Sequence, residues 1–347
     1  MRVRFSLKPQ TLPLLKTLSI ALCTYNGSRF LREQLQSLAN QTLMPFEVIV
    51  SDDCSSDNTL SIIKEFDKVL NIKILINKTP LKVAKNFENA ILHCSGDIIF
   101  TCDQDDIWHK EKLEKISQYF EENPEKLAVF SDAILVDENG NSLKKTFWSI
   151  VRFFQPQIEQ WENGQSVDLL LFGNRPSGCM TAFRRELIEY IIPFPTHIPE
   201  MIHDNWIAMV AAMINSIGVI EEQLISYRQH SSQQIGVRPK NNGEIITLQG
   251  RFLRPRREKL LPFLEKRDYF STLKNALLER IDSKNPNFKK FDNIINYFES
   301  RGTMPDFHLR RILPIFKLLI NRDYQRYKDQ EASRQATLLA ILGDLLE

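Results

Sequence analysis

The chain has 347 residues, 43% of them hydrophobic and 25% charged, which excludes a disordered chain and allows a sizeable core. Its five cysteines are scattered without a C-x-x-C pair, which argues against a disulfide framework or a zinc ribbon and favours a reducing compartment. The net charge is +2, but residues 240–347 carry 21 Lys and Arg against 14 Asp and Glu, a balance of +7 that leaves −5 for residues 1–239. We therefore expect the two parts to have different roles.

Strands and amphipathic helices alternate over the first 120 residues. Apolar runs of strand length occur at 18–22, 46–50, 72–76 and 97–101. Between them, apolar residues recur at helical spacing in 30–39, 62–70 and 83–91. This order predicts βαβ units, and so an α/β fold with a mixed, mostly parallel sheet flanked by helices.

The elements after residue 120 are shorter and more varied. We predict strands at 127–130, 178–183 and 224–227, a turn at 137–140, a short helix at 186–192 and an apolar helix opening at 203–206. Residues 145–175 are aromatic and rich in Gln and Asn, and we interpret them as a loop over the site. From residue 240 helical periodicity dominates. The chain therefore divides into an N-terminal extension (1–16), an α/β domain (17–239) and a helical, basic C-terminal region (240–347).

No targeting or membrane-spanning segment is expected. Pro9 and Pro13 interrupt any apolar run near the start, which argues against a signal peptide. The most apolar stretch, 206–220, is too short to cross a bilayer and is broken by Asn215 and Ser216. We expect a soluble, cytoplasmic protein, in peripheral contact with the inner face of the plasma membrane at most.

The most informative stretch is 96–108, GDIIFTCDQDDIW, in which a buried strand leads directly into Asp103, Asp105 and Asp106. Three clustered carboxylates repel one another, and a hard divalent cation such as Mg²⁺ or Mn²⁺ would compensate their negative charge. A D-x-D sequence taken alone fits a solvated loop or a helix N-cap equally well. The preceding apolar strand and the following Ile107 and Trp108 favour a fixed, ligand-binding loop.

Other polar side chains also follow predicted strands or open helices. They are Asp52, Asp53, Asp204 and His230. Because ligands of open α/β sheets bind outside the carboxyl ends of the strands, we expect these groups to converge on one crevice. Asp52 and Asp53 can accept hydrogen bonds from a ribose or a base, or stabilise a helix N-terminus. Taken alone, His230 also fits a packing or surface histidine.

Several nucleotide and hydrolase motifs are missing. The sequence contains no G-x-G-x-x-G, no G-x-x-x-x-G-K-[ST] and no G-x-S-x-G. This disfavours a nicotinamide-dependent enzyme, a P-loop NTPase and an α/β-hydrolase. If the protein binds phosphates, a metal ion would then neutralise them instead of the backbone N–H groups of a glycine-rich loop. This indicates a nucleoside diphosphate ligand.

Seven segments in a fixed order resemble the family 2 glycosyltransferases, which have the GT-A fold. They span about residues 17–238 and read SIALCTYNGSRFLREQLQSLANQT, VIVSDDCSSDNT, GDIIFTCDQDDIW, FSDAILVDENG, GCMTAFRREL, HDNW and YRQHSSQQIG. The combination of DQDDIW, HDNW and YRQH is similar to bacterial enzymes of O-antigen, capsule and rhamnose-polysaccharide assembly. The resemblance implies that the donor is a nucleoside diphosphate sugar. The nucleotide would be dTDP or UDP, and rhamnose is one option for the sugar. It also implies Mn²⁺ or Mg²⁺, a saccharide or lipid-linked acceptor, and no nucleic-acid partner.

The same resemblance implies a role for each matching residue. Thr24, Tyr25 and Asn26 would line the nucleotide pocket, and Asp53 would read the base with Asp52 beside it. Asp103 would contact the ribose and the metal, Asp105 would bind the metal, and Asp106 would support both. Asp204 would be the general base, and His230 would lie near the diphosphate or the metal.

These roles describe an inverting, metal-dependent glycosyltransferase. One carboxylate suffices to deprotonate the acceptor hydroxyl in a single in-line displacement, which inverts the anomeric centre. A catalytically silent GT-A-like scaffold subunit is the alternative. A nucleotidyltransferase is less consistent, because the sequence CTYNGSRF after the first strand lacks a glycine-rich, basic phosphate loop.

The C-terminal region lies outside the resemblance. It contains a basic run at 251–259 and an amphipathic, basic helix at 309–319. This helix fits docking on an anionic membrane surface, where a lipid-linked acceptor would reside. It fits equally a helical bundle that packs on the α/β domain and leaves a charged face in water.

Overall fold

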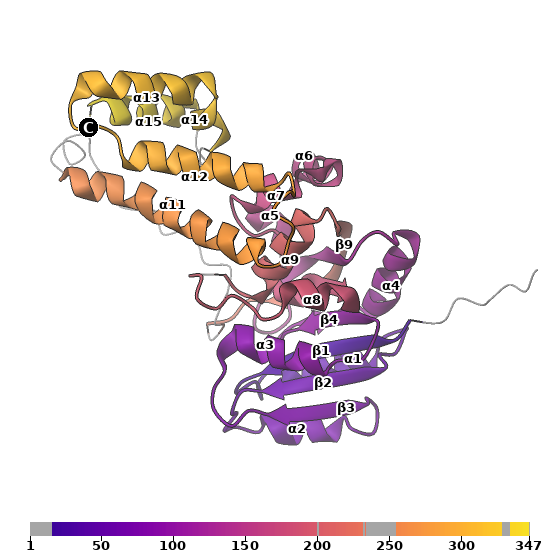
Figure 1. The fold of residues 1–347 in the computed structure, drawn as a ribbon. Coiled ribbons are helices and arrows are strands. Elements are labelled where there is room, and N and C mark those ends of the chain that lie inside the picture. Colours follow the sequence, from indigo (N-terminus) through magenta and orange to yellow (C-terminus); the bar gives the residue numbers. More distant parts are fainter. Residues whose placement is uncertain (1–15, 200, 232, 234–254, 328–333, 347) are drawn as a thin grey trace, which may run out of the picture.

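The computed structural model describes residues 16–199, 201–231, 233, 255–327 and 334–346 (Figure 1). The strands are β1 (Leu18–Thr24), β2 (Glu47–Asp52), β3 (Ile72–Ile76), β4 (Ile98–Cys102), β5 (Ile107–Trp108), β6 (Ala128–Val136), β7 (Ser142–Thr146), β8 (Thr181–Arg184) and β9 (Ile217–Arg228). The helices that accompany them are α1 (Leu31–Ala39), α2 (Thr59–Glu65), α3 (Lys82–His93), α4 (Lys112–Glu122), α5 (Phe147–Val151), α6 (Gln155–Gln160), α7 (Ser166–Leu170), α8 (Ile188–Ile191) and α9 (His203–Met213). Short helical turns are η1 (Trp161–Gln165), η2 (Gly178–Met180) and η3 (Arg185–Leu187).

The strands form one mixed sheet in the order β3-β2-β1-β4-β8-β6-β9-β5, with β7 paired to β6. β3, β2, β1 and β4 are parallel neighbours, as the alternation of strands and helices predicts. Thr24 lies opposite Asp52, and Leu22 opposite Cys102. The residues that follow these three strands therefore emerge at the same edge of the sheet. The predicted α/β architecture is confirmed.

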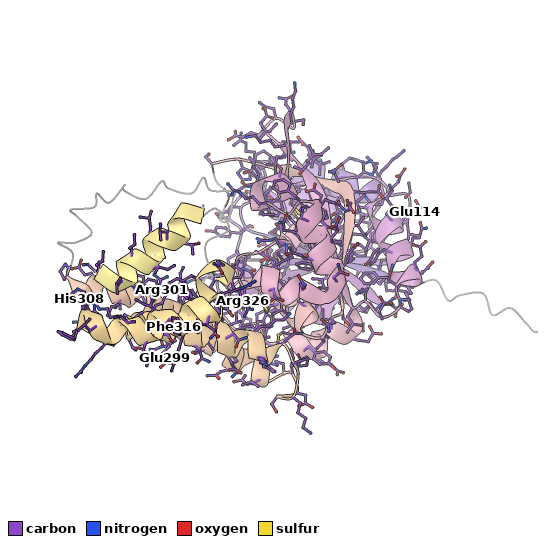
Figure 2. All side chains as sticks on the ribbon, turned by 90° about the horizontal axis from the view of Figure 1, so that it is seen from above. Glu114, Glu299, Arg301, His308, Phe316 and Arg326 are labelled. Atoms are coloured by element: carbon purple, nitrogen blue, oxygen red, sulfur yellow. The ribbon has the colours of Figure 1, made fainter. Side chains whose placement is uncertain are left out.

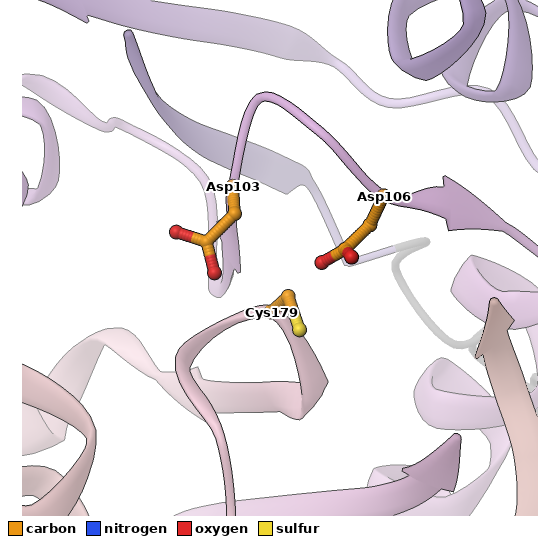
Figure 3. Close-up of side chains that lie close together, drawn as sticks. All are labelled: Asp103, Asp106 and Cys179. Carbon is orange, nitrogen blue, oxygen red and sulfur yellow. The ribbon is translucent and has the colours of Figure 1, made fainter. Parts of the chain in front are cut away.

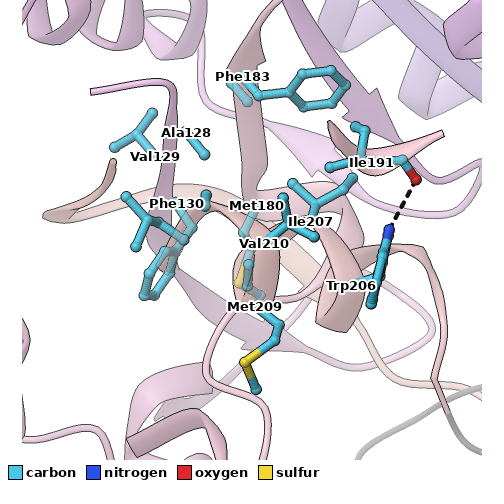
Figure 4. Close-up of a cluster of buried hydrophobic side chains, with 14 of the residues drawn as sticks. Ala128, Val129, Phe130, Met180, Phe183, Ile191, Trp206, Ile207, Met209 and Val210 are labelled. Carbon is cyan, nitrogen blue, oxygen red and sulfur yellow. Dashed lines mark hydrogen bonds between the residues drawn. The ribbon is translucent and has the colours of Figure 1, made fainter. Parts of the chain in front are cut away.

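The core lies between the sheet and its helices. β4 is fully buried on both faces, and β1 is buried except for Cys23, which explains their continuous apolar runs. α3 packs against β1 and β2. On the other half of the sheet, Met180 and Phe183 pack with Ile207 and Val210 of α9, and the Trp206 indole donates a 2.8 Å hydrogen bond to the Ile191 carbonyl (Figure 4).

The interpretation of residues 145–175 as a loop is wrong. This stretch contains the end of β7, then α5, α6, η1 and α7. Its aromatic residues Trp148, Phe153 and Trp161 gather around Phe130 of β6, with ring centroids 5.1–5.8 Å from that ring. Burial of large aromatic surfaces orders the segment although its helices are too short to form alone.

Other boundaries also differ from the prediction, and β6 continues to Val136 although the predicted strand ends at residue 130. Residues 178–180 form the turn η2, and strand β8 begins only at Thr181. The last strand of the sheet begins at Ile217 and is much longer than the predicted 224–227. Helix α9 ends at Met213, and Asn215 adopts a left-handed conformation with φ of 54° that turns the chain into β9.

The C-terminal helices extend away from the sheet (Figure 1). They are α11 (Arg256–Leu278), α12 (Phe288–Gly302), α13 (His308–Ile320), α14 (Asp323–Arg326) and α15 (Arg334–Leu346). Arg280 joins this region to the α/β domain through hydrogen bonds to the carbonyls of Ile192 and Pro193. The proposed domain boundary near 238–243 lies outside the described residues. In the part of the chain that the structure describes, no helix has both the length and the apolar character needed to cross a membrane.

Candidate active site

A cavity of about 440 Å³ opens at the carboxyl edge of the parallel strands. Most of the residues predicted for the site line it, namely Thr24, Tyr25, Asn26, Asp53, Asp103, Asp105, Asp204 and His230. They come from five separate loops or element ends, which the sheet brings together as expected for an open α/β fold. Asp52 and Asp106 do not line the cavity.

Asp52 lies beneath the cavity rather than in it. Its carboxylate accepts hydrogen bonds from the Thr24 hydroxyl (2.8 Å) and from the Ser55 amide (2.8 Å) and hydroxyl (2.6 Å). These hydrogen bonds compensate the negative charge of the Asp52 carboxylate and fix the turn that follows β2. The Asp52 side chain points to the neighbouring strand, so it does not line the cavity beside Asp53.

Asp53 lines the cavity and also fixes the start of α3. Its carboxylate accepts from the Asn77 amide group (2.9 Å) and from the backbone N–H groups of Leu81 (2.6 Å) and Lys82 (2.9 Å). Lys82 has a φ of 64°, a left-handed conformation that a lysine adopts only when its surroundings impose it. Asp53 thus holds this loop as part of the cavity wall.

Gln104, which the sequence did not single out, connects the acidic loop to the turn after β1. Its side-chain oxygen accepts from the Tyr25 N–H (2.8 Å), and its amide nitrogen donates to the Tyr25 carbonyl (3.1 Å). A Cβ atom on Gly27 would lie 2.2 Å from the Gln104 oxygen, so a larger residue at this position would displace the Gln104 side chain. Gln104 lies between two of the predicted ligands, but no sequence pattern indicates which way its side chain points.

The acidic loop brings carboxylates close together (Figure 3). Ligand atoms of Asp103, Asp106 and Cys179 all lie within 4.8 Å of one another. Asp105 forms a 2.9 Å contact with Nε2 of His230. Asp106 is buried, and one of its oxygens accepts from the Arg228 N–H (3.0 Å) while the other has no hydrogen-bond partner among the described residues.

The electrostatics of this loop fit a bound divalent cation. Desolvation, followed by the charges of Asp105 and Asp106, raises the pKa of Asp103 well above its ordinary value. The unpartnered oxygen of Asp106 adds a further uncompensated acceptor. Oxygen-rich sites of this kind suit Mg²⁺ or Mn²⁺. Burial keeps Cys179 a neutral thiol by raising its pKa, which makes the sulfur a poor ligand for such ions.

Two buried cations lie behind the acidic loop. Lys112 donates to the Cys179 carbonyl (2.6 Å), and its ammonium lies 3.5 Å from the centre of the Trp108 ring. Burial lowers its pKa to about 8. Arg228 donates to the Asp105 carbonyl (2.9 Å), and its guanidinium lies over the Phe30 ring, which also contacts the His230 ring. Sequence reasoning gave neither residue a role, because both reach partners that are distant along the chain.

Asp204 lies in the first turn of helix α9 and also lines the cavity. Burial raises its pKa to about 7. The preceding residue, His203, stacks on Phe87 with ring centroids 3.8 Å apart, and neither of its ring nitrogens has a hydrogen-bond partner among the described residues. Burial lowers the pKa of His203 to about 3, so this histidine is a neutral part of the cavity wall.

The sequence model of glycosyl transferase family 2 matches residues 19–191, about half of the chain, including β1, β2, the acidic loop and β8. The chain belongs to glycosyl transferase family 2. This agrees with the resemblance that the seven segments indicate. Asp204 and His230 lie beyond the matched residues, and the fold brings them to the same cavity.

Two other proteins are similar over 62% of the chain. The dTDP-rhamnosyl transferase RfbG of Shigella flexneri is 28% identical over 228 residues, which cover 62% of this chain and 73% of that protein. The uncharacterized protein Rv1520 of Mycobacterium tuberculosis is 28% identical over 220 residues, or 62% of this chain and 59% of that protein. The match thus leaves out a large part of the mycobacterial relative.

Among solved structures, residues 1–349 of Staphylococcus aureus TarS in complex with UDP have a TM-score of 0.53 and 20% sequence identity. The superposition covers 89% of this chain and 77% of that one. At this level of identity the likeness concerns the fold, and it identifies the sheet and its helices as the GT-A fold.

Proposed function

We propose that this family 2 member is an inverting, metal-dependent glycosyltransferase that uses a nucleoside diphosphate sugar. The observation that carries the proposal is the cavity at the strand ends, where an acidic loop with His230 faces a buried carboxylate on α9. Asp103, Asp105 and His230 would hold Mn²⁺ or Mg²⁺, and the cation, when bound, would neutralise the diphosphate and stabilise the leaving group's charge. Thr24, Tyr25, Asn26 and Asp53 would hold the nucleoside.

In this proposal Asp204 is the general base. Its carboxylate takes the proton from the acceptor hydroxyl as the acceptor oxygen forms a bond to the anomeric carbon. The bond from that carbon to the diphosphate oxygen breaks on the opposite side, and the nucleoside diphosphate leaves with the electron pair. One displacement inverts the anomeric centre, and a pKa near 7 suits a base that works close to neutral pH.

We further propose that the donor is a dTDP- or UDP-sugar, with rhamnose as one option, and that the acceptor is a growing cell-surface saccharide or a lipid-linked oligosaccharide. The name of RfbG as a dTDP-rhamnosyl transferase and the UDP bound to TarS support these two bases. The proposed setting is the cytoplasm, at the inner face of the plasma membrane, with contact through the basic C-terminal region. The +7 balance of residues 240–347 supports such contact.

The donor site can be tested by thermal melting of the full chain with UDP, dTDP, GDP or NAD⁺, each with and without Mn²⁺. A ligand at about 100 times its dissociation constant adds roughly 2.7 kcal/mol of stability, which is a clear shift in Tm. We expect metal-dependent stabilisation by UDP or dTDP that is lost in Asp105→Asn. Asp67→Asn, an exposed change outside the cavity, is the matched control. If none of the nucleoside diphosphates shifts the Tm, a catalytically silent scaffold subunit explains the protein better than an enzyme does.

A further inference from the structure

Helix α13 exposes its apolar stripe instead of burying it. Large apolar side chains on one side of the helix are 53–68% exposed, namely Leu309, Ile312, Leu313, Phe316 and Ile320. Their spacing of three and four residues places them along a continuous stripe. The side of α13 that packs inward carries Arg311, Ile315 and Leu318. If α13 served only to pack on the rest of the protein, the long apolar stripe would be the buried side.

The charges beside this stripe are all positive. Arg310 and Lys317 are exposed and seven residues apart, two helical turns, so both border the stripe on the same flank. Neither forms an ion pair with any residue that the structure describes. No acidic residue lies between Phe307 and Arg322. Arg311 is different, because it turns inward and donates to the carbonyls of Pro305 (2.7 Å) and Asp306 (2.8 Å).

The stripe lies on the outside of the molecule. Figure 1 shows α13 in the outermost layer of the helical region, away from the sheet. Seen from above, His308 and Phe316 lie toward one end of the molecule and Glu114 of α4 toward the other (Figure 2). A flat surface can therefore meet α13 without covering the sheet or its helices.

We propose that this face of α13 docks on an anionic lipid surface, with its apolar side chains in the interface and Arg310 and Lys317 at the headgroups. This deepens the proposed function, on which it rests, because it assigns the membrane contact to particular residues. A helix with an apolar face and only basic charges beside it is typical of interfacial helices. A symmetric contact between two copies would instead bring the cations of two α13 helices together without a carboxylate on either helix to offset them.

Co-sedimentation of the full-length protein with vesicles tests this assignment. We expect binding to vesicles that contain phosphatidylglycerol, weakened by salt, and about tenfold less binding to phosphatidylcholine alone. Phe316→Glu should reduce binding to the anionic vesicles by about tenfold, since it places a charge in the apolar stripe. Val69→Glu is the matched control, because Val69 and Phe316 are both 57% exposed and Val69 lies on the α/β domain.

The charged flank is tested separately by Arg310→Gln/Lys317→Gln, compared with Lys68→Gln/Lys73→Gln, which removes two exposed cations from the α/β domain. We expect only the first pair to weaken binding. Sedimentation of Phe316→Glu like the wild type would overturn the assignment. So would light scattering that shows a wild-type dimer and a monomeric Phe316→Glu.

The Tm shift with UDP or dTDP and Mn²⁺, measured on the same samples, separates this inference from the proposed function. Each variant should keep the shift of the wild type, which also shows that it folds. A wild type that binds nucleotide but no vesicles overturns the docking alone. A wild type that binds vesicles but no nucleotide overturns the proposed donor site and supports the docking face.

Discussion

Asp204 is a carboxylate held in a position that favours its neutral form. It is almost fully buried at the first turn of α9, and this burial raises its pKa to about 7 despite the hydrogen bond from the Asn205 N–H. A general base must be ionised to accept a proton. Only the protein molecules in which Asp204 is deprotonated are therefore active, and their fraction grows as the pH rises through this pKa. The environment of one residue thus sets the pH range in which the proposed reaction runs.

We expect kcat/KM for transfer to rise with pH, about tenfold per unit below pH 7, and to level off above it. The sign follows from the chemistry: lowering the pH protonates Asp204 and removes the base. Asp204→Asn should lower kcat by about 10²- to 10⁴-fold and retain the Tm shift with nucleotide and Mn²⁺. A pH profile that stays flat across pH 7, or an Asp204→Asn protein with wild-type kcat, would remove Asp204 from this role.

Arg228, the last residue of β9, connects four parts of the fold. Its side chain donates to the carboxylate of Glu33 on α1 (2.5 Å), to the Asp105 carbonyl of the acidic loop and to the Glu138 carbonyl after β6 (2.7 Å). It is almost completely buried. The position of the acidic loop therefore depends on the end of a strand that lies more than 120 residues later in the chain.

Replacing Arg228 by methionine should destabilise the protein by about 2–4 kcal/mol, because two partly buried carbonyls lose a donor that is itself buried. Arg29→Met is the matched control: Arg29 also lies 4.7 Å from the Phe30 ring centre and pairs with Glu138, but its side chain is 58% exposed. Loss of such an exposed pair costs about 0–1 kcal/mol. Urea unfolding of both variants measures the difference, and equal losses would contradict the connecting role of Arg228.

At the scale of elements, the sequence predicts what depends on local pattern. The alternation of apolar strands and amphipathic helices predicted the parallel half of the sheet, and the motif residues predicted for the site include eight of the 22 residues that line the cavity. Local pattern alone does not indicate which of two adjacent carboxylates faces the cavity, because side chains alternate along a strand and either register of Asp52 and Asp53 fits; only the family resemblance assigned the base to Asp53. Local pattern also missed Gln104, Lys112 and Arg228, whose roles depend on partners distant in sequence.

At the scale of the whole molecule, the C-terminal end of α9 is one of the places where the helical region contacts the α/β domain. Asn285 and Asn287, in the turn before α12, both donate to the carbonyl of Met213, the last residue of α9, at 2.8 and 2.9 Å. This carbonyl is one of the last four of the helix, which have no hydrogen-bond partner within the helix itself. Asp204 lies in the first turn of the same helix. The C-terminal region therefore completes the helix that carries the proposed base.

We expect Asn285→Ala/Asn287→Ala to lower the free energy of unfolding by about 1–3 kcal/mol, because the Met213 carbonyl then lacks both donors. If these contacts also hold α9 in place, kcat should fall while the donor KM stays close to that of the wild type. Lys290→Ala is the control, since the Lys290–Asp168 pair joins the same two parts but is more exposed, and its loss should cost no more than about 1 kcal/mol. Urea unfolding and steady-state kinetics on the three proteins decide the point. A double variant with wild-type kcat would show that the C-terminal region stabilises α9 without influencing the position of Asp204.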